Sequence, residues 1–337
     1  MFKDTIVCPY PFEEIEINVQ GDVYTCCPSW NNGYSIGNIY KQSLDEIWNG
    51  EKVQILRKKI LTNDFSLCNN KHCLYCSSRK FKTKFDSEYK VRMEEFPKSV
   101  KFGYDYECNS QCIICRKEIT VLPNEERDLL DEKIDTFFIP LLTNAQILTI
   151  NTAGDPFGSR HSRKVIQKAT EKYPKLKFDF TTNGLLLNEK MIEQLNIKWN
   201  QIDTIRISIH AATAKTYGKI VHNGENLFPK LLSNLEFLSK MKNNYKFDFL
   251  FNFVVITENY KEIPLFIEFA KKYNAFPIFW EYKKDCCTNV GYCKNSDIVD
   301  ETHEQHNELI KVLKEIKKYS DEEYLLYPLL KNIQEKT

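Results

Sequence analysis

The sequence predicts an α/β protein of parallel βα units, with a smaller α+β module at its N-terminus. Between residues 96 and 282, apolar runs bounded by turn residues alternate with segments of helical periodicity. Residues 1–95 lack this alternation and contain six of the 12 cysteines. Parallel βα units form an open sheet or an incomplete barrel, and their active sites lie at the carboxyl ends of the strands.

Composition excludes several classes of protein. The 337 residues suffice for about two domains. With 47 Lys and Arg against 46 Asp and Glu, the net charge of +1 gives no global field for nucleic acid or an anionic membrane. The start MFKDTIVCPY has no secretion signal, and the longest apolar stretch, residues 247–256, is too short to span a bilayer. We therefore expect a cytoplasmic protein whose thiols serve metal or redox chemistry and do not form disulfides.

The N-terminal module, residues 1–95, begins with a predicted hairpin that turns at Gly21-Asp22. Ser43 and Glu46 form a capping box that opens a helix, and a second helix is expected over residues 53–61. Because this module has few apolar residues, a metal cluster would stabilise it in place of a larger hydrophobic core. The six thiols available for such a cluster are Cys8, Cys26, Cys27, Cys68, Cys73 and Cys76.

The second predicted domain, residues 96–282, consists of six strands and the helices between them. The strands are expected at 99–106, 145–152, 176–182, 202–209, 245–256 and 275–282. The helices are expected at 125–142, 162–172, 188–195, 227–242 and 260–273. Because strand side chains alternate between two faces, polar residues of one parity should line the interior. This reasoning places Arg206, Ser208, His210, Asp105, Asn151, Asp179, Thr181, Asn252 and Glu281 inside. Among them, Glu281 and Asp105 are the candidates for substrate contact or proton acceptance.

The central motif, Cys108-Asn109-Ser110-Gln111-Cys112-Ile113-Ile114-Cys115, follows the first strand of this domain. Three thiolates on one short loop can hold three irons of a [4Fe–4S] cluster and leave the fourth iron open for chemistry. A zinc knuckle or a closed electron-transfer cluster would need a fourth local ligand, and no further Cys or His is near.

The spacing and position of this motif resemble the radical S-adenosylmethionine (SAM) superfamily, over about residues 96–282. The resemblance implies a partial (βα)6 TIM-type barrel in which the open iron chelates the amino and carboxylate groups of SAM. It implies an electron from a donor such as flavodoxin or ferredoxin, which cleaves SAM to a 5′-deoxyadenosyl radical. That radical abstracts hydrogen from a substrate C–H bond.

Two further segments match family positions. Ala153-Gly154-Asp155-Pro156 ends the second strand, where the family binds the SAM amine through backbone carbonyls, and Thr181-Thr182-Asn183-Gly184 ends the third. Arg206 and Ser208 could hold the SAM carboxylate, since both are suitable donors. The alternative for these two residues is a polar network that is satisfied within the barrel.

The N-terminal module resembles the SPASM and Twitch auxiliary-cluster domains. The resemblance lies in Cys8, in the spacing of Gly21 and Cys26, and in residues 36–39 and 43–48. A second [4Fe–4S] cluster needs four ligands. We expect Cys8, Cys26, Cys73 and either Cys68 or Cys76, with Cys27 a bystander. The alternative is a zinc site. Such a cluster could accept an electron from a substrate radical or only shape the pocket.

The tail, residues 283–337, is predicted to be a cysteine-containing loop followed by helix. Cys286 and Cys287 follow the sixth strand and could donate a hydrogen atom to a substrate radical. With Cys293 they could instead ligate a second auxiliary cluster or be structural.

Three functions remain open from the sequence. The first is a radical SAM oxidoreductase or epimerase that modifies a peptide residue by oxidation, cross-linking or epimerisation, because peptide-modifying enzymes dominate the auxiliary-cluster branch. The second is a dehydrogenase or epimerase of a small molecule, a sugar or an aminocyclitol. The third, an iron–sulfur electron-transfer or scaffold protein, predicts no SAM binding.

Overall fold

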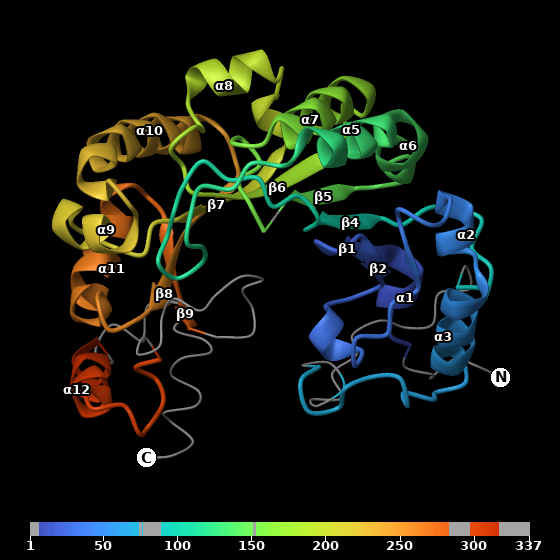
Figure 1. The fold of residues 1–337 in the computed structure, drawn as a ribbon, viewed down its shortest axis with the longest axis horizontal. Coiled ribbons are helices and arrows are strands. Elements are labelled where there is room, and N and C mark those ends of the chain that lie inside the picture. The colour runs from blue at the N-terminus through green and yellow to red at the C-terminus, as the bar shows by residue number, and fades with distance from the viewer. Residues whose placement is uncertain (1–6, 74–75, 77–88, 151–152, 283–296, 317–337) are drawn as a thin grey trace. The chain divides into compact units, whose positions relative to one another are not determined.

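The computed structural model describes residues 7–73, 76, 89–150, 153–282 and 297–316 (Figure 1). Contacts within the chain define two compact units. The first unit contains residues 1–106, 122–152 and 161–178, and the second contains 107–121, 153–160 and 179–337.

The first unit is built on a mixed sheet that includes the predicted hairpin. Its strands are β1 (Glu14–Ile17), β2 (Asp22–Tyr24), β3 (Gly37–Asn38), β4 (Ser99–Phe102) and β5 (Ile147–Ile150). β1 is antiparallel to β2 and β2 to β3, whereas β1 is parallel to β4 and β4 to β5. The hairpin turns where Asn18 Oδ1 accepts hydrogen bonds from Gln20 N (3.0 Å) and Asp22 N (2.9 Å), and Gly21 takes a φ of +76°. The hairpin therefore shares hydrogen bonds with the first strand of the predicted barrel.

The first unit contains helices before, between and after these strands. They are α1 (Tyr10–Glu13), α2 (Leu44–Trp48), α3 (Glu51–Leu61), α5 (Asn124–Glu132), a π-helical turn (Ile134–Phe138), α6 (Ile139–Leu141) and α7 (Arg160–Lys172). Phe102 of β4 packs edge-on against Phe138, with ring centroids 5.4 Å apart. Residues at alternate positions, Glu14, Glu16 and Lys101, lie on the other face, and Glu14 is buried in an ion pair with Lys101 at 2.8 Å.

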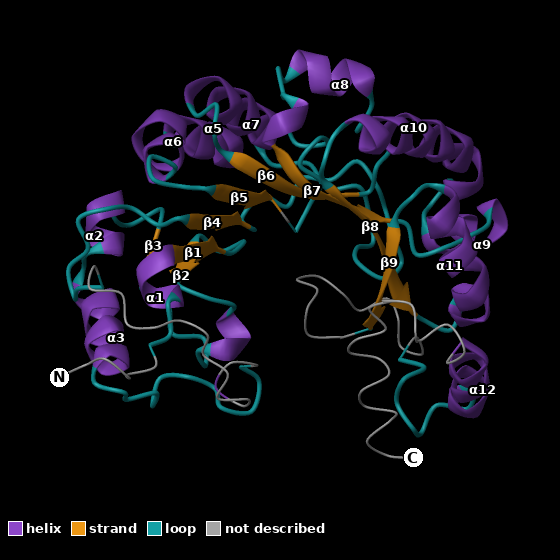
Figure 2. Ribbon diagram, turned by 180° about the vertical axis from the view of Figure 1, so that it is seen from behind, coloured by secondary structure: helices purple, strands orange, loops and turns teal. Residues whose placement is uncertain are grey.

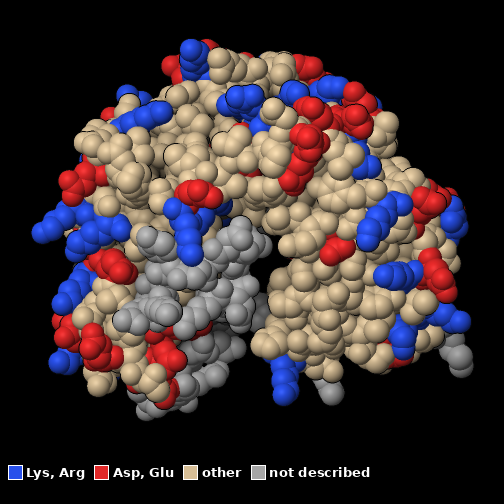
Figure 3. All heavy atoms as spheres, viewed as in Figure 1, with Lys and Arg blue, Asp and Glu red and all other residues tan. Residues whose placement is uncertain are grey.

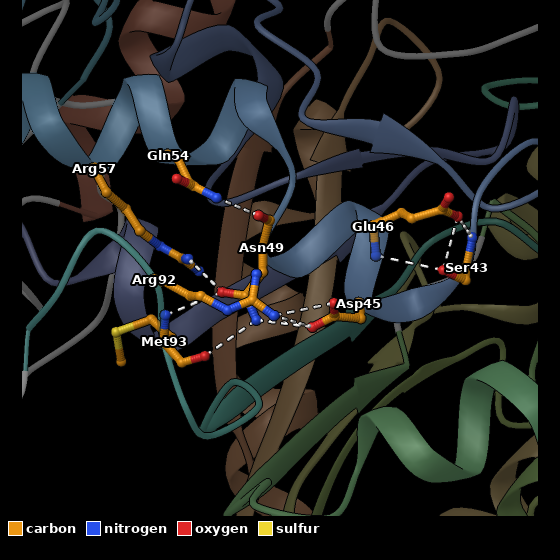
Figure 4. A network of polar contacts seen from close by, with 8 residues as sticks. All are labelled: Ser43, Asp45, Glu46, Asn49, Gln54, Arg57, Arg92 and Met93. Carbon is orange, nitrogen blue, oxygen red and sulfur yellow. Dashed lines mark hydrogen bonds and ion pairs between the residues drawn. The ribbon is translucent and has the colours of Figure 1, made fainter.

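The capping box is confirmed, and a buried arginine joins α2 and α3 to the chain that follows (Figure 4). Glu46 N donates to Ser43 Oγ, and the Glu46 carboxylate accepts from Ser43 N at 2.8 Å. Arg57 is fully buried, with its guanidinium carbon 4.2 Å from the ring centroid of Trp48. It donates to the carbonyl oxygens of Pro11 (2.8 Å) and Val91 (3.2 Å). Cation–π contact and carbonyl acceptors replace an acidic partner here.

The second unit contains the parallel strands β7 (Ile202–Ser208), β8 (Asp248–Val255) and β9 (Phe276–Glu281). β6 (Lys177–Thr182) ends in this unit. The helices are α8 (Glu189–Gln194), α9 (Ala214–Ile220), α10 (Gly224–Asn244), α11 (Ile263–Lys272) and α12 (His306–Ile316), and short 3-10 turns lie at Trp199–Gln201 and Tyr260–Glu262 (Figure 2). The α/β class with parallel strands is confirmed, and each of the six predicted strand segments contains an observed strand.

The register of the second unit corrects one predicted side-chain placement. In β7–β9, Arg206 aligns with Leu250, and Ser208 with Asn252 and then Ile278, on one face. Glu281 aligns with Val255, two positions beyond the buried pair Phe253 and Phe279. Glu281 therefore lies on the aromatic face that packs against α11, and not beside Arg206 and Ser208 as predicted.

Two findings concern surfaces. The described residues visible in Figure 3 show Lys and Arg interspersed with Asp and Glu, as the net charge of +1 suggests. Within the described ranges, no helix combines the length and apolar character needed to cross a lipid bilayer.

Candidate functional site

The three-cysteine loop, residues 107–121, lies in the second unit and is held at both ends by backbone bonds. Cys108 N donates to Thr120 O at 2.9 Å, and Ile113 N donates to Ile220 O at 2.9 Å at the end of α9. Between them, Cys112 forms an isolated β-bridge with Val221. These bonds fix the loop without using any thiol.

The thiols of this loop are close enough to influence one another. Burial raises the pKa of Cys108 to about 11, and the neighbouring Cys115 adds to the rise. Burial raises the pKa of Cys112 further, with contributions from Cys108 and Cys115. Arg116 acts in the opposite direction on both, because its cation favours thiolates. Thiols grouped in this way, with Cys108 buried and Cys112 and Cys115 half-buried, suit metal ligation, in which the metal displaces the protons.

A buried hydroxyl in the same loop fits an iron–sulfur cluster. The Oγ atom of Ser110, midway between Cys108 and Cys112, is buried and has no hydrogen-bond partner among the described residues. Buried polar atoms are normally satisfied, so this hydroxyl calls for an acceptor. The sulfur atoms of a bound cluster would supply one.

The three segments that carry the family resemblance meet in this unit. Asn183, at the end of β6, donates from Nδ2 to Asn109 Oδ1 at 2.9 Å, and the same nitrogen lies 4.0 Å from Cys108 Sγ. Arg116 donates from Nη2 to Cys115 Sγ at 3.4 Å and to the carbonyl oxygen of Ala153. Residues 37 and 74 positions apart in sequence are thus in direct contact around the cysteines.

Asp155 fastens two of these segments together. Its carboxylate, 1% exposed, accepts hydrogen bonds from the backbone N–H groups of Phe157 and Gly158, both at 3.0 Å. It also accepts from Asn183 N and Thr182 Oγ1, both at 2.7 Å. The carboxylate is therefore engaged by the protein, and Asp155 places the loop backbone that the resemblance assigns to SAM. Gly154 and Ala153 lie in that loop, half-buried.

Arg206 and Ser208 share a face of β7, as parity predicted. Arg206 forms an ion pair through Nη1 with Asp179 of β6, a partner of the same predicted interior set. Asn252, opposite Ser208 in the register, accepts from Trp280 Nε1 at 3.1 Å. One part of the predicted polar network is thus satisfied within the protein.

The remaining predicted residues have different positions. Asp105, in the first unit, is buried and accepts a hydrogen bond from Ser162 in the first turn of α7. His210 is also buried, and its Nδ1 accepts from Val254 N at 3.0 Å. Cys286, Cys287 and Cys293 lie outside the described residues, as does Asn151.

Five thiols of the first unit form a second group. Burial raises the pKa of Cys8 to about 12, and Cys68 and Cys73 contribute. Burial also raises the pKa of Cys26, with contributions from Cys8, Cys68 and Cys73. Cys76 N donates to Cys73 Sγ at 3.5 Å. The four predicted ligands, with both options for the fourth, are therefore neighbours.

Cys27 is directed elsewhere, and a second buried hydroxyl without a described partner belongs to the residue before Cys26. The Sγ atom of Cys27 lies 3.2 Å from Ser29 Oγ. Thr25, adjacent to Cys26, is fully buried, and its Oγ1 has no hydrogen-bond partner among the described residues. A cluster sulfur would satisfy this donor too.

The geometry differs from that of a single-ion site. Among the described residues, no three Cys, His, Asp or Glu side chains are grouped to hold one metal ion. In a four-iron cluster each thiolate binds a different iron.

Sequence reasoning missed Arg116 as a site residue. The available signal was its position directly after Cys115, because a cation beside a thiolate stabilises the ligating form. Its second acceptor, the Ala153 carbonyl, could not be seen in the sequence.

Comparisons with known proteins support the N-terminal prediction. Residues 8–77 match the SPASM family, described as an iron–sulfur cluster-binding domain. An uncharacterized protein of Methanocaldococcus jannaschii is 29% identical over 135 residues, or 40% of this chain and 41% of that protein. The chain thus aligns with about two fifths of this curated relative.

Solved structures also resemble the chain. Streptococcus suis SuiB bound to S-adenosylmethionine is 18% identical and aligns over 66% of this chain and 48% of its own, with a TM-score of 0.42. SuiB bound to its precursor peptide SuiA is 15% identical over 80% of this chain and 60% of its own, with a TM-score of 0.42. Residues 8–77 of the chain therefore resemble the iron–sulfur cluster-binding domain of the SPASM family.

Proposed function

We propose that this chain is a radical SAM enzyme that abstracts hydrogen from a substrate C–H bond. The observation that carries the proposal is the meeting of three segments, residues 108–116, 153–158 and 182–184. The sequence resemblance assigns the first segment to the cluster and the second to the SAM amine, and it matches the third as a motif at the end of a strand. A scaffold protein would not need these strand ends to converge on a loop that supplies only three thiolates for a four-iron cluster.

Different residues would bind the cluster and SAM. Cys108, Cys112 and Cys115 would ligate three irons, and the loop that begins at Ala153 would receive the SAM amine through its backbone. When bound, a [4Fe–4S] cluster would pass on the electron that cleaves the sulfonium of SAM, and SAM would yield the 5′-deoxyadenosyl radical that takes the hydrogen atom. The protein's own part is to hold these groups in position and keep water away.

Buried side chains around the loop support water exclusion. Tyr217 of α9 is 1% exposed, and burial raises its pKa, with a contribution from Cys112. Ile114, inside the motif, is also buried. Both side chains would reduce solvent access to the reacting groups.

Anaerobic turnover tests the reaction class. Reconstituted protein, reduced with dithionite and given SAM, should release 5′-deoxyadenosine, detected by chromatography and mass spectrometry. Cys112→Ala should release none, because the cluster loses one of its three ligands. Lys117→Ala, an exposed change in the same loop, should keep the activity. Protein with a full iron content that forms no 5′-deoxyadenosine, with or without substrate, would refute the proposal.

The proposed substrate is a peptide residue. The support is the SPASM match at residues 8–77, because the resemblance to proteins that combine this domain with a radical SAM loop implies peptide modification. The proposed net change is an oxidation, cross-link or epimerisation. A peptide deuterated at the reacting carbon should transfer its label to 5′-deoxyadenosine, as measured by mass spectrometry. If deuterium reaches 5′-deoxyadenosine only from a labelled sugar or aminocyclitol, the substrate is a small molecule and not a peptide.

A further inference from the structure

Arg116, directly after the third cysteine, contacts two parts of the proposed site. Its Nη2 atom lies 3.4 Å from Cys115 Sγ, and the same nitrogen donates to the carbonyl oxygen of Ala153. One guanidinium nitrogen thus joins a proposed cluster ligand to the loop proposed to bind the SAM amine. The side chain is half-buried, which limits screening of its charge by solvent.

The guanidinium lies beside one of the proposed ligating sulfurs, with Nη2 3.4 Å from Cys115 Sγ. An arginine side chain stays charged throughout the working pH range of proteins. The loop therefore contains a permanent positive charge, anchored at two acceptors, beside its ligating sulfurs.

We propose that Arg116 is a positioning residue that raises the reduction potential of the cluster on Cys108, Cys112 and Cys115. This inference rests on the proposed function, because it presupposes a cluster at that loop. Reduction adds one negative charge to a cluster, and a fixed cation that donates to a ligating sulfur stabilises the added charge. The Ala153 carbonyl holds the guanidinium in this orientation, so the stabilising charge needs little reorganisation.

The potential of the cluster without SAM tests the inference separately from turnover. In Arg116→Met the side chain keeps a similar reach but loses the charge and the donors. Its midpoint potential, followed by electron paramagnetic resonance during a redox titration, should become more negative than that of the unmodified protein. Lys117→Met is the matched control, because it removes an exposed cation from the next residue. Its potential should remain that of the unmodified protein.

The signal of this cluster is the one that disappears in Cys112→Ala, which separates it from the auxiliary cluster. If Arg116→Met fails to take up iron, Arg116→Gln, which also removes the charge, should show the same direction of shift. A full cluster with an unchanged potential in the neutral variant would overturn the inference alone. Equal shifts in Arg116→Met and Lys117→Met would also overturn it, since contact with Cys115 would then be irrelevant. Iron content that does not depend on Cys112 would overturn the proposed function as well.

Discussion

Single side chains hold the strand ends of the second unit in place. The buried carboxylate of Asp155 accepts four hydrogen bonds that link the loop at residues 153–158 to Thr182 and Asn183. Four donors aimed at one carboxylate reduce the cost of burying its charge, although burial still raises the pKa of Asp155. His210 does similar work after β7, because its ring accepts from Val254 N and its carbonyl oxygen accepts from Asn259 Nδ2 at 2.8 Å.

His210 predicts a loss of stability in acid. Burial lowers its pKa from 6.5 to about 4, so the unfolded chain binds a proton more readily than the folded one. Stability from this residue is therefore complete above pH 6.5 and is lost as the pH falls towards 4, by roughly 3 kcal/mol. His210→Asn keeps an acceptor for Val254 N and tolerates the φ of +62°, but it does not titrate. Denaturant unfolding between pH 7 and 5 should show a smaller loss of stability in this variant than in the unmodified protein.

The matched control for this prediction is His222→Asn, since His222 is exposed. Its loss of stability with falling pH should equal that of the unmodified protein. An identical pH dependence in His210→Asn and in the unmodified protein would show that His210 is not the titrating group.

At the scale of elements, loops between strands and helices bring the cysteines together. The auxiliary group takes Cys8 from before α1, Cys26 from just after β2, and Cys68, Cys73 and Cys76 from beyond α3. Because these loops are anchored by short elements with small cores, a bound cluster would contribute to the stability of the module.

The direction of Cys27 predicts which thiol is spare. Its Sγ faces Ser29 Oγ, whereas Cys73 is buried among the other thiols. Cys27→Ala should retain the iron of the unmodified protein, and Cys73→Ala should lose about four irons per chain, the content of one cluster. Iron and acid-labile sulfide assays after anaerobic reconstitution measure both. If Cys27→Ala loses iron, Cys27 is a cluster ligand, and Cys68 or Cys76 is the spare thiol.

At the scale of the whole chain, the predicted module and the predicted barrel are joined by backbone hydrogen bonds. β1 of the module pairs in parallel with β4, and residues 8–77 carry the SPASM match. A boundary near residue 95 remains a prediction from composition. On the face drawn in Figure 3, Lys and Arg are interspersed with Asp and Glu.

Local patterns predicted the parts of this protein that depend on neighbouring residues. The C-x3-C-x2-C spacing identified the central loop, the alternation of apolar runs located all six strands, and Ser43 with Glu46 located the start of α2. These features follow from short-range geometry: the period of a strand, the first turn of a helix and the reach of one loop.

The tertiary structure alone decided which side chains meet. Period two shows that Phe276, Ile278 and Trp280 share one face of β9, but both faces carry apolar residues, so the sequence could not show on which face Glu281 lies. The contacts of Asp155 with Asn183, and of Arg116 with Ala153, join residues 28 and 37 positions apart. Such contacts depend on strand register and loop closure over the whole fold, which no local spacing contains.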